Sequence, residues 1–459
     1  MEKKVEGIYD GFKELGTGKM LVLGLQHVFA MFGATVLVPI ITGLSVSVTL
    51  FCAGIATIWF YFITKRKIPI FLGSSFAFLA AFGAIAPKLL DGAGAQTVPN
   101  LEMLPYATLG VVCAGILYVI LAILFAVFGA KKIMRLFPPV VTGPIIILIG
   151  LTLASSAINN ARSNWVLAVV AIAIIVCVNL FGKGMIKILP ILCGIFGSYF
   201  IGVVVGLINP TLFGLPWVDL SSLVGQKIVA VPPFMDYSPL RFVFGQQAFD
   251  PAIGLPALIT FVAVAIAAMV EHIGDICAIG ATCGKNFIAD PGLTRTLLGD
   301  GVGTSLAGLF GGPANTTYSE NTGVVALTKV YDPQVMFIAA CMAIVLSFRN
   351  IFNAFINTIP AAIIGGISIV LYGMISATGV RTIVENQVDF KNMRNVIVAA
   401  LILVCGLGFN TYPIQIGKLT FGGLFMAAFV GIIVNAILPG KDYEFKIEEV
   451  QKTENTIQA

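Results

Sequence analysis

Several ionisable residues stand inside apolar stretches of this chain, where they could do chemistry. Glu271, His272 and Asp275 lie within one apolar run that begins at Ile253. Glu271 and Asp275 are four residues apart and therefore share one face of a helix. Two carboxylates this close in a low dielectric are not both charged near neutral pH, so one should hold a proton. The pair predicts a site that exchanges a proton.

His272 points elsewhere, because it lies about 100° around the helix from Glu271. We expect it to pack or to hydrogen-bond, and we also count it with Glu271 and Asp275 as a candidate for proton coupling. The structural alternative for Asp275 is that it caps a kink at Gly274.

A further carboxylate, Glu320, sits between a break rich in Gly, Pro and Thr and a resumed apolar run, in the segment 313–329. A polar group at membrane depth is costly unless it is buried in protein or faces a cavity. Glu320 is therefore a second candidate site residue, at the start of a broken helix.

The composition is that of a polytopic membrane protein. Of the 459 residues, 58% are hydrophobic and only 11% are charged, and the mean hydropathy is +0.99. A helix needs about 20 apolar residues to cross a hydrocarbon core of ~30 Å. Breaking the chain at charges, prolines and polar clusters predicts an all-α fold of about fourteen spans, with the third and tenth short.

The basic residues fall in alternate loops. With fourteen spans and a cytoplasmic N-terminus, 21 Lys and Arg lie inside, and 6 lie outside: Lys88, Arg162, Lys227, Arg241, Arg349 and Lys418. This bias follows the positive-inside rule and predicts a protein of the cytoplasmic membrane with both termini in the cytoplasm. The basic residues form no patch that would bind nucleic acid.

Neither a metal site nor a disulfide framework is predicted. The eight cysteines lie singly in or beside apolar segments, and the chain has two histidines. Such spacing assembles neither kind of site.

Two pairs of landmarks share one offset of 245 residues. Gln26-His27 corresponds to Glu271-His272, and Ser74-Ser75 corresponds to Ser319-Glu320. We therefore expect two halves of seven spans each. An odd-numbered repeat inserts its second copy upside down relative to the first, which is the inverted-repeat architecture of many secondary transporters.

Inverted repeats place the substrate site near the midplane, between discontinuous helices. The segments 68–72 and 314–318 are predicted to be short and extended, because of Pro69 and the β-favouring Thr-Thr-Tyr. They would pair inside the protein, and half-helices would begin near Ser75 and Ser319 with free N–H groups facing a cavity. The alternative is two ordinary short spans packed through glycines.

Motifs along nearly the whole chain resemble one family. Glu320-Asn321-x-Gly323 followed by Thr328-Lys329 resembles the signature of the nucleobase-ascorbate transporters, and Glu in its first position resembles the uracil permease branch. The resemblance runs from LQHVFAMFGATVLVP at 25–39 through KIPIFLGSSFAF, EHIGD, DPGL and NTTYSENTGV to LYGMISATGVR at 371–381.

The resemblance implies a uracil importer of a bacterial cytoplasmic membrane, driven by a proton gradient and without a cofactor, that forms a homodimer. It also implies that Glu271, Glu320 and the backbone amides of Phe76 and Ser319 bind uracil. Carboxylates accept from the N–H groups of the base, and amides donate to its carbonyls, so every polar edge would be paired.

The ring of Phe76 or Tyr318 would form a wall of this site, and Ser75 would lie beside it. Further residues are expected to support the site: Gln26, His27, Asn321, Gly323, Thr328 and Asp300. The alternative for His27 is an ordinary interhelical hydrogen bond, and Asp300 is expected near a membrane boundary as a helix cap.

The resemblance also implies two domains. A core domain would hold spans 1–4 (1–130) and spans 8–11 (251–358). A gate domain would hold spans 5–7 with an exterior loop (131–250) and spans 12–14 (359–440), followed by a cytoplasmic tail at 441–459.

The chain departs from the uracil pattern at two positions, since that branch can have His at the position of Asp275 and Gly at that of Ser319. Asp at the first is similar to the xanthine branch, whereas Glu320 in place of Gln favours uracil. The alternative substrate is therefore xanthine or uric acid.

Two other protein classes are disfavoured by the sequence. A channel would need rings of charge around a symmetric pore. An intramembrane hydrolase would need motifs such as H-E-x-x-H or G-x-S-x-G, which the sequence lacks. We expect a transporter and not an enzyme.

Overall fold

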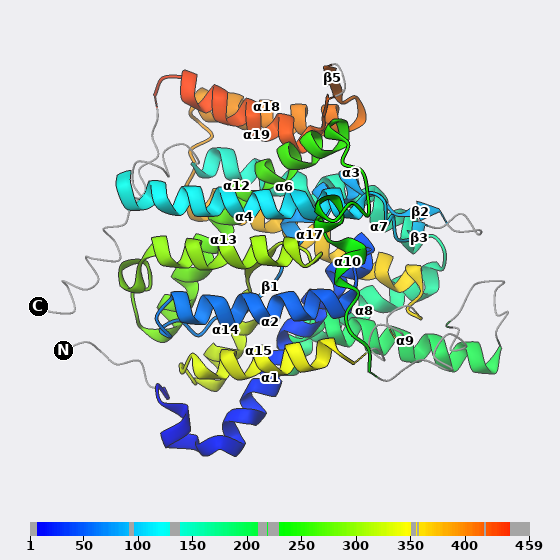
Figure 1. Cartoon of the computed structure of the whole chain (residues 1–459), viewed down its shortest axis with the longest axis vertical. Coiled ribbons are helices and arrows are strands. Elements are labelled where there is room, and N and C mark those ends of the chain that lie inside the picture. Colours follow the sequence, from blue (N-terminus) through cyan, green and yellow to red (C-terminus); the bar gives the residue numbers. More distant parts are fainter. Residues whose placement is uncertain are drawn as a thin grey trace, which may run out of the picture.

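The protein is described here from a computed structural model, which describes residues 7–90, 96–128, 138–209, 218, 229–349, 355, 358–416 and 419–440. The predicted tail at 441–459 lies outside these residues. Most of the described chain forms helices that run roughly side by side (Figure 1). In the first half the helices are α1 (Gly11–Thr42), α2 (Val46–Ile63), α3 (Leu79–Ile85), α4 (Leu104–Phe128), α6 (Pro139–Thr152), α7 (Ala154–Ala161), α8 (Trp165–Phe181) and α9 (Pro190–Ile208).

In the second half, the first three helices again decrease in length, as α1, α2 and α3 do in the first half. Its helices are α12 (Pro251–Cys283), α13 (Leu293–Leu309), α14 (Ser319–Thr328), α15 (Gln334–Ser347), α17 (Ala361–Glu385), α18 (Met393–Thr411) and α19 (Gly423–Ile437). Within the described residues, eight helical stretches, with α6 and α7 taken together, are long and apolar enough to cross a membrane by themselves. The count of fourteen spans stays a prediction.

The two halves pack reciprocally. Helix α2 packs against α15 while its counterpart α13 packs against α4, and α1 packs against α15 while α12 packs against α4. The same exchange holds for α6 with α18 and α17 with α8. Each contact between the halves thus recurs when the two halves are exchanged, which is the arrangement that an inverted repeat produces.

The helices form two packed groups. One contains α1, α2, α4, α12, α13 and α15, and the other contains α6 to α9 and α17 to α19. The division into a core and a gate domain, with the boundaries expected from the sequence, stays a prediction. That the groups move as two domains remains a prediction.

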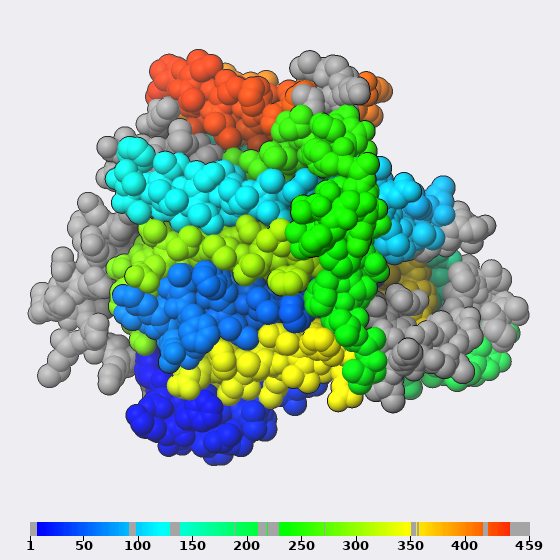
Figure 2. Space-filling view, viewed as in Figure 1, coloured from blue at the N-terminus to red at the C-terminus, as the bar shows by residue number. Residues whose placement is uncertain are grey.

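Part of the long segment between α9 and α12 crosses the ends of the first group. It contains α10 (Phe234–Tyr237) and α11 (Leu240–Val243), and Figure 2 shows it in green across several helices. The Ser238 hydroxyl donates to the Leu309 carbonyl at 2.6 Å, and the ring of Phe234 packs edge-on against Phe51. The contacts tie together the ends of α13 and α2.

Two short strands meet in the middle of the first group. Strands β1 (Leu72–Ser74) and β4 (Asn315–Thr317) pair antiparallel, with Gly73 opposite Thr316. The pairing predicted from the sequence is present, but β1 begins four residues later than the predicted segment 68–72. Pairing starts at Leu72 because that is where β4, only three residues long, offers a partner.

Glycine is required at position 73 of β1. A Cβ there would lie 2.4 Å from Cζ of Tyr318 and 2.8 Å from its hydroxyl oxygen. Tyr318 cannot withdraw easily, because it is buried and its hydroxyl bonds to Thr35 and Ser74. The ribbon and the tyrosine therefore fit together only without a side chain at 73.

Gly73→Ala is expected to lower the stability of the purified protein by about 1–3 kcal/mol, the usual cost of overpacking, and to reduce substrate uptake. Gly83→Ala in α3 is the matched control, since a Cβ at 83 meets nothing within 4 Å. Thermal unfolding in detergent measures both. Equal stability of the two variants would contradict the packing argument.

Candidate functional site

Two half-helices begin where the ribbon ends. After β1, a 3₁₀ turn at Phe76–Phe78 leads into α3, and after β4 the helix α14 begins directly at Ser319. The first N–H groups of a helix have no partner within the helix. The amides at Phe76 and Ser319 stand at the first positions of these two half-helices, where an N–H group can donate to a ligand. That they bind the substrate stays a prediction.

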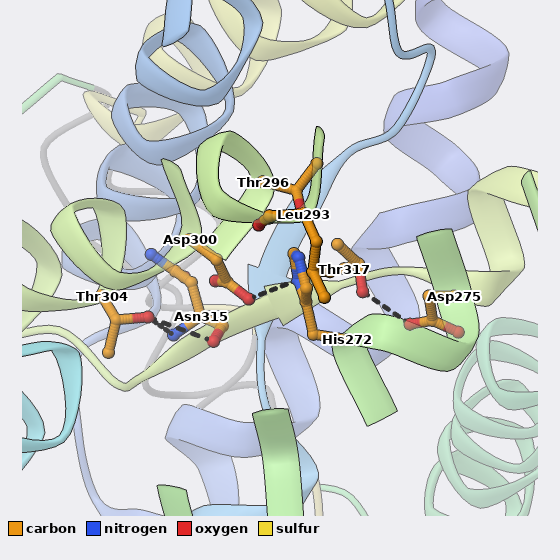
Figure 3. A network of polar contacts seen from close by, with 8 residues as sticks. All are labelled: His272, Asp275, Leu293, Thr296, Asp300, Thr304, Asn315 and Thr317. Atoms are coloured by element: carbon orange, nitrogen blue, oxygen red, sulfur yellow. Dashed lines mark hydrogen bonds and ion pairs between the residues drawn. The ribbon is translucent and has the colours of Figure 1, made fainter. Parts of the chain in front are cut away.

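Asp275 holds the start of α14 to α12. Its carboxylate accepts hydrogen bonds from the hydroxyls of Thr317 at 2.6 Å and Ser319 at 2.7 Å; Figure 3 shows the Thr317 bond. Helix α12 continues without a break through Gly274, so Asp275 does not cap a kink there. This carboxylate therefore joins α12 to β4 and to the start of α14.

Glu271 lies one turn before Asp275 and is exposed. Further exposed residues follow it on the same face of α12: Gly274, Cys277, Ala278 and Ala281. This face leads toward Cys283, whose carbonyl accepts a hydrogen bond from Tyr9 just before α1. Because a carboxylate facing lipid is costly, we interpret this face as the wall of a water-accessible path that opens on the side where α1 begins.

Glu320 faces a cavity of about 310 Å³. Ser319, Glu320 and Gly323 of α14 line the cavity together with residues of α17: Ile367, Leu371 and Met374. Glu271 lies close enough to Glu320 and Asp275 for their charges to interact. The volume is at the lower end of the range for small-molecule sites, about 300–1,000 Å³, and mixed polar and apolar walls are typical of them.

A larger cavity of about 770 Å³ lies further along α1 and α17. On α17 it touches Ala361 and Ile364, whereas the smaller cavity begins at Ile367. The nearest lining residues of the two cavities on this helix, Ile364 and Ile367, are thus three positions apart, about 4.5 Å along the helix axis.

Lys88 lies in the wall of the larger cavity, and its ammonium donates to the carbonyl of Ile40 at 2.5 Å. Burial lowers the pKa of Lys88 to about 8, because desolvation disfavours the charged form.

Of the two predicted ring walls, Phe76 is partly exposed and Tyr318 is buried. The Tyr318 hydroxyl bonds to the Thr35 hydroxyl at 3.1 Å and to the Ser74 carbonyl at 2.9 Å. Tyr318 therefore supports the ribbon, while Phe76 remains available to a ligand. Ser75 is also buried, and its N–H donates to the Ala314 carbonyl at 2.8 Å.

His272 points away from Asp275 and toward Asp300. Its Nδ1 lies 2.8 Å from Asp300 Oδ2, and neither side chain has any exposed surface (Figure 3). The expectation that Asp300 caps a helix at a membrane boundary is wrong, because Asp300 lies inside α13. The error arose because 27 residues separate the two partners, so that only the packing of α12 against α13 could bring them together.

The remaining predicted residues lie in α1 and α14, and one pair of them joins the two helices. The Asn321 side-chain amide lies 3.1 Å from both Nδ1 and the backbone carbonyl of His27. His27 thus makes the interhelical hydrogen bond that the sequence left open. Gln26 is half-buried in α1, and Thr328 donates to the Val324 carbonyl within α14.

Sequence reasoning did not single out four buried threonines: Thr35, Thr57, Thr304 and Thr317. Each bonds to the ribbon, to Tyr318 or to Asp275. A threonine hydroxyl inside an apolar segment needs a hydrogen-bond partner, and this was the signal that the sequence offered. The sequence does not show which residue that partner is.

Solved structures show which class of protein this fold defines. The chain resembles the transmembrane domain of a cyanobacterium bicarbonate transporter, BicA, at 15% identity, with a TM-score of 0.54 over 94% of this chain and 99% of that one. It resembles SLC26A9 at 12% identity, with a TM-score of 0.60 over 91% of this chain and 64% of that one. The chain has the fold of these proteins, and the inverted repeat expected from the sequence is confirmed.

Sequence comparisons identify the family. The permease family matches residues 18–415. The chain is 38% identical to the uracil permease of Bacillus subtilis (strain 168), over 90% of this chain and 91% of that protein. It is 35% identical to the putative pyrimidine permease RutG of Escherichia coli (strain K12), over 95% and 93%. The chain belongs to this permease family, the nucleobase-ascorbate transporters, and is a transporter and not an enzyme.

Proposed function

We propose that this protein imports uracil together with protons by alternating access. The observation that carries the proposal is Glu320, which stands at the N-terminal end of a half-helix and faces a cavity of small-molecule size. Relatives named as uracil permeases, at 37–38% identity over most of the chain, support the substrate.

In this proposal uracil is held by its polar edge. Glu271 and Glu320 accept hydrogen bonds from the N–H groups of the base, and the amides of Phe76 and Ser319 donate to its carbonyls. The partly exposed ring of Phe76 lies against the base. Pairing every polar group matters because an unpaired buried group costs about 1–3 kcal/mol.

The proton would be carried by the carboxylates of α12. Asp275 accepts hydrogen bonds from the hydroxyls of Thr317 and Ser319, next to the Ser319 amide that would bind the substrate. Loss or gain of the Asp275 proton would therefore change the hydrogen bonds that hold the start of α14. Glu271, one turn away, is the second candidate carrier. The buried pair of His272 and Asp300 lies behind them on the side of α13.

Movement of the two helix groups past one another would open the site to either side. The two cavities support this, since both touch α1 and α17, and a displacement that joined them would connect the larger cavity with Glu320. With its water-accessible path on the side where α1 begins, the conformation described here would be the inward-facing one. We further propose that two copies associate in the membrane, which cross-linking in native membranes would test.

Uptake of radiolabelled uracil into proteoliposomes tests the function. We expect uracil to accumulate when the outside is acidified, and to equilibrate only when the pH gradient is collapsed. Competition with xanthine and uric acid tests the alternative substrate class. Stronger competition by xanthine than by unlabelled uracil would overturn the choice of uracil.

The orientation proposal places the residues 65–67 in the cytoplasm of a bacterial cell. Cysteines introduced there should resist an impermeant thiol reagent in intact cells and react after permeabilisation. A cysteine in place of the exposed Leu90, on the opposite side of the membrane, should react without permeabilisation. Labelling of the first site in intact cells would show that the orientation is reversed.

A further inference from the structure

The β1–β4 ribbon has two free edges in the middle of a membrane protein. A two-stranded ribbon pairs only the backbone groups that face its partner, and the groups on its outer edges need other partners. Inside a membrane, water is not there to supply them, and an unsatisfied backbone group is costly. The ribbon is therefore stable only if other parts of the protein supply hydrogen-bond partners for the backbone groups on its outer edges.

A threonine of α2 closes the outer edge of β1. The Thr57 hydroxyl accepts from the Leu72 N–H at 2.9 Å and donates to the Leu72 carbonyl at 3.1 Å. One hydroxyl thus makes both bonds that a third strand would make to Leu72. The Thr57 side chain is 1% exposed, so water does not compete for these bonds.

A threonine of α13 does the same for β4. The Thr304 hydroxyl accepts from the Asn315 N–H at 3.3 Å and donates to the Asn315 carbonyl at 3.2 Å (Figure 3). Thr304 is also 1% exposed. Helices α2 and α13 occupy equivalent places in the two halves, so the same arrangement occurs on both sides of the ribbon.

Each contact holds the first residue of a strand whose other end leads to an amide assigned to the substrate. Leu72 precedes Phe76 by four residues, and Asn315 precedes Ser319 by four residues. The intervening residues are the strands themselves and one extended residue, Ser75 or Tyr318. A strand held at its first residue therefore transmits that position to the start of its half-helix.

We propose that Thr57 and Thr304 are positioning residues of the transport site. Each hydroxyl anchors one strand to a long helix and so sets where the amide of Phe76 or Ser319 stands relative to Glu271. The substrate part of this proposal rests on the proposed function, whereas the anchoring does not.

Valine and serine substitutions separate the hydroxyl from the shape of the side chain. Thr304→Val and Thr57→Val keep the shape and lose both hydrogen bonds, while Thr304→Ser and Thr57→Ser keep the hydroxyl. Thr296→Val in α13 and Thr49→Val in α2 are matched controls. These two threonines are equally buried, but their hydroxyls bond only to carbonyls of their own helices, those of Leu293 and Ser45.

Uracil binding to the purified variants is the first measurement, made well below their unfolding temperatures. We expect each Val variant at 57 and 304 to weaken binding about tenfold or more, and the Ser variants and controls to stay within about twofold of wild type. Lower thermal stability with unchanged affinity would show a merely structural role and overturn the proposal. An effect at 304 alone would also overturn it, since that result would point to the neighbouring Asp300.

Hydrogen exchange of the backbone gives a readout that needs no substrate. Faster exchange is expected at 315–322 in Thr304→Val and at 72–79 in Thr57→Val, but not in the Ser variants or the controls. If the wild-type protein binds no uracil, the proposed function fails. The exchange pattern still tests whether Thr57 and Thr304 anchor the strands. Unchanged exchange in folded Val variants would overturn this anchoring, and if one Val variant does not fold, the other carries the test.

Discussion

Asp275→Asn is expected to abolish accumulation of uracil driven by a pH gradient while uracil binding stays within about tenfold of wild type, ~1.4 kcal/mol. Asparagine is nearly the same size, and its amide can still bond to both hydroxyls, accepting from one and donating to the other. It cannot take up a proton. This variant should therefore keep uracil binding and lose gradient-driven accumulation, whereas a variant that merely disrupts the site should lose both.

Equilibrium binding in detergent and uptake in proteoliposomes, with and without an imposed pH gradient, measure the two properties. Asp290→Asn, at an exposed carboxylate between α12 and α13, is the control. Asp275→His should restore part of the coupling, because imidazole titrates near neutral pH. If the Asn variant still accumulates uracil in proportion to the gradient, the proton travels elsewhere, and Glu271 becomes the candidate.

Glu320→Gln is expected to weaken uracil binding by ~1–3 kcal/mol, the scale for loss of a charged hydrogen bond in a buried site. A carboxylate only accepts, and it accepts from base N–H groups with both oxygens. An amide accepts with one oxygen, and its NH₂ group is left facing a donor. The affinity for xanthine relative to uracil should rise, because Gln occupies this place in the xanthine branch that the sequence also resembles.

Competition binding with uracil and xanthine measures both effects in one experiment. Glu385→Gln, at the exposed end of α17, is the control for loss of a carboxylate on the same protein. An unchanged affinity for uracil in a folded Glu320→Gln variant would place Glu320 outside the groups that contact the substrate.

Much of this site was predictable because membrane insertion imposes strict local rules. An apolar run of about 20 residues must form a helix, and a carboxylate inside it must have a reason to be there. Glu271, Asp275 and Glu320 could therefore be selected without a structure. The break before Ser319 also predicted a half-helix, and its short extended segment is present as β4.

Contacts between distant residues were not predictable. The sequence assigned Asp300 to a boundary, yet it lies fully buried beside His272, and it offered Tyr318 as a ligand wall, yet that ring is buried against Gly73. Both outcomes depend on which helix faces which, and the rules that govern one helix in a bilayer do not contain that information.

The sequence by itself determined the class of protein, the family and the inverted repeat, and it selected the acidic candidates for the site. The tertiary structure decided how those residues are held: Asp275 by hydroxyls of β4 and α14, and the strands by Thr57 and Thr304. The physical reason is that hydropathy acts on each segment separately, whereas a buried hydrogen bond exists only once two segments have packed with the right groups opposed.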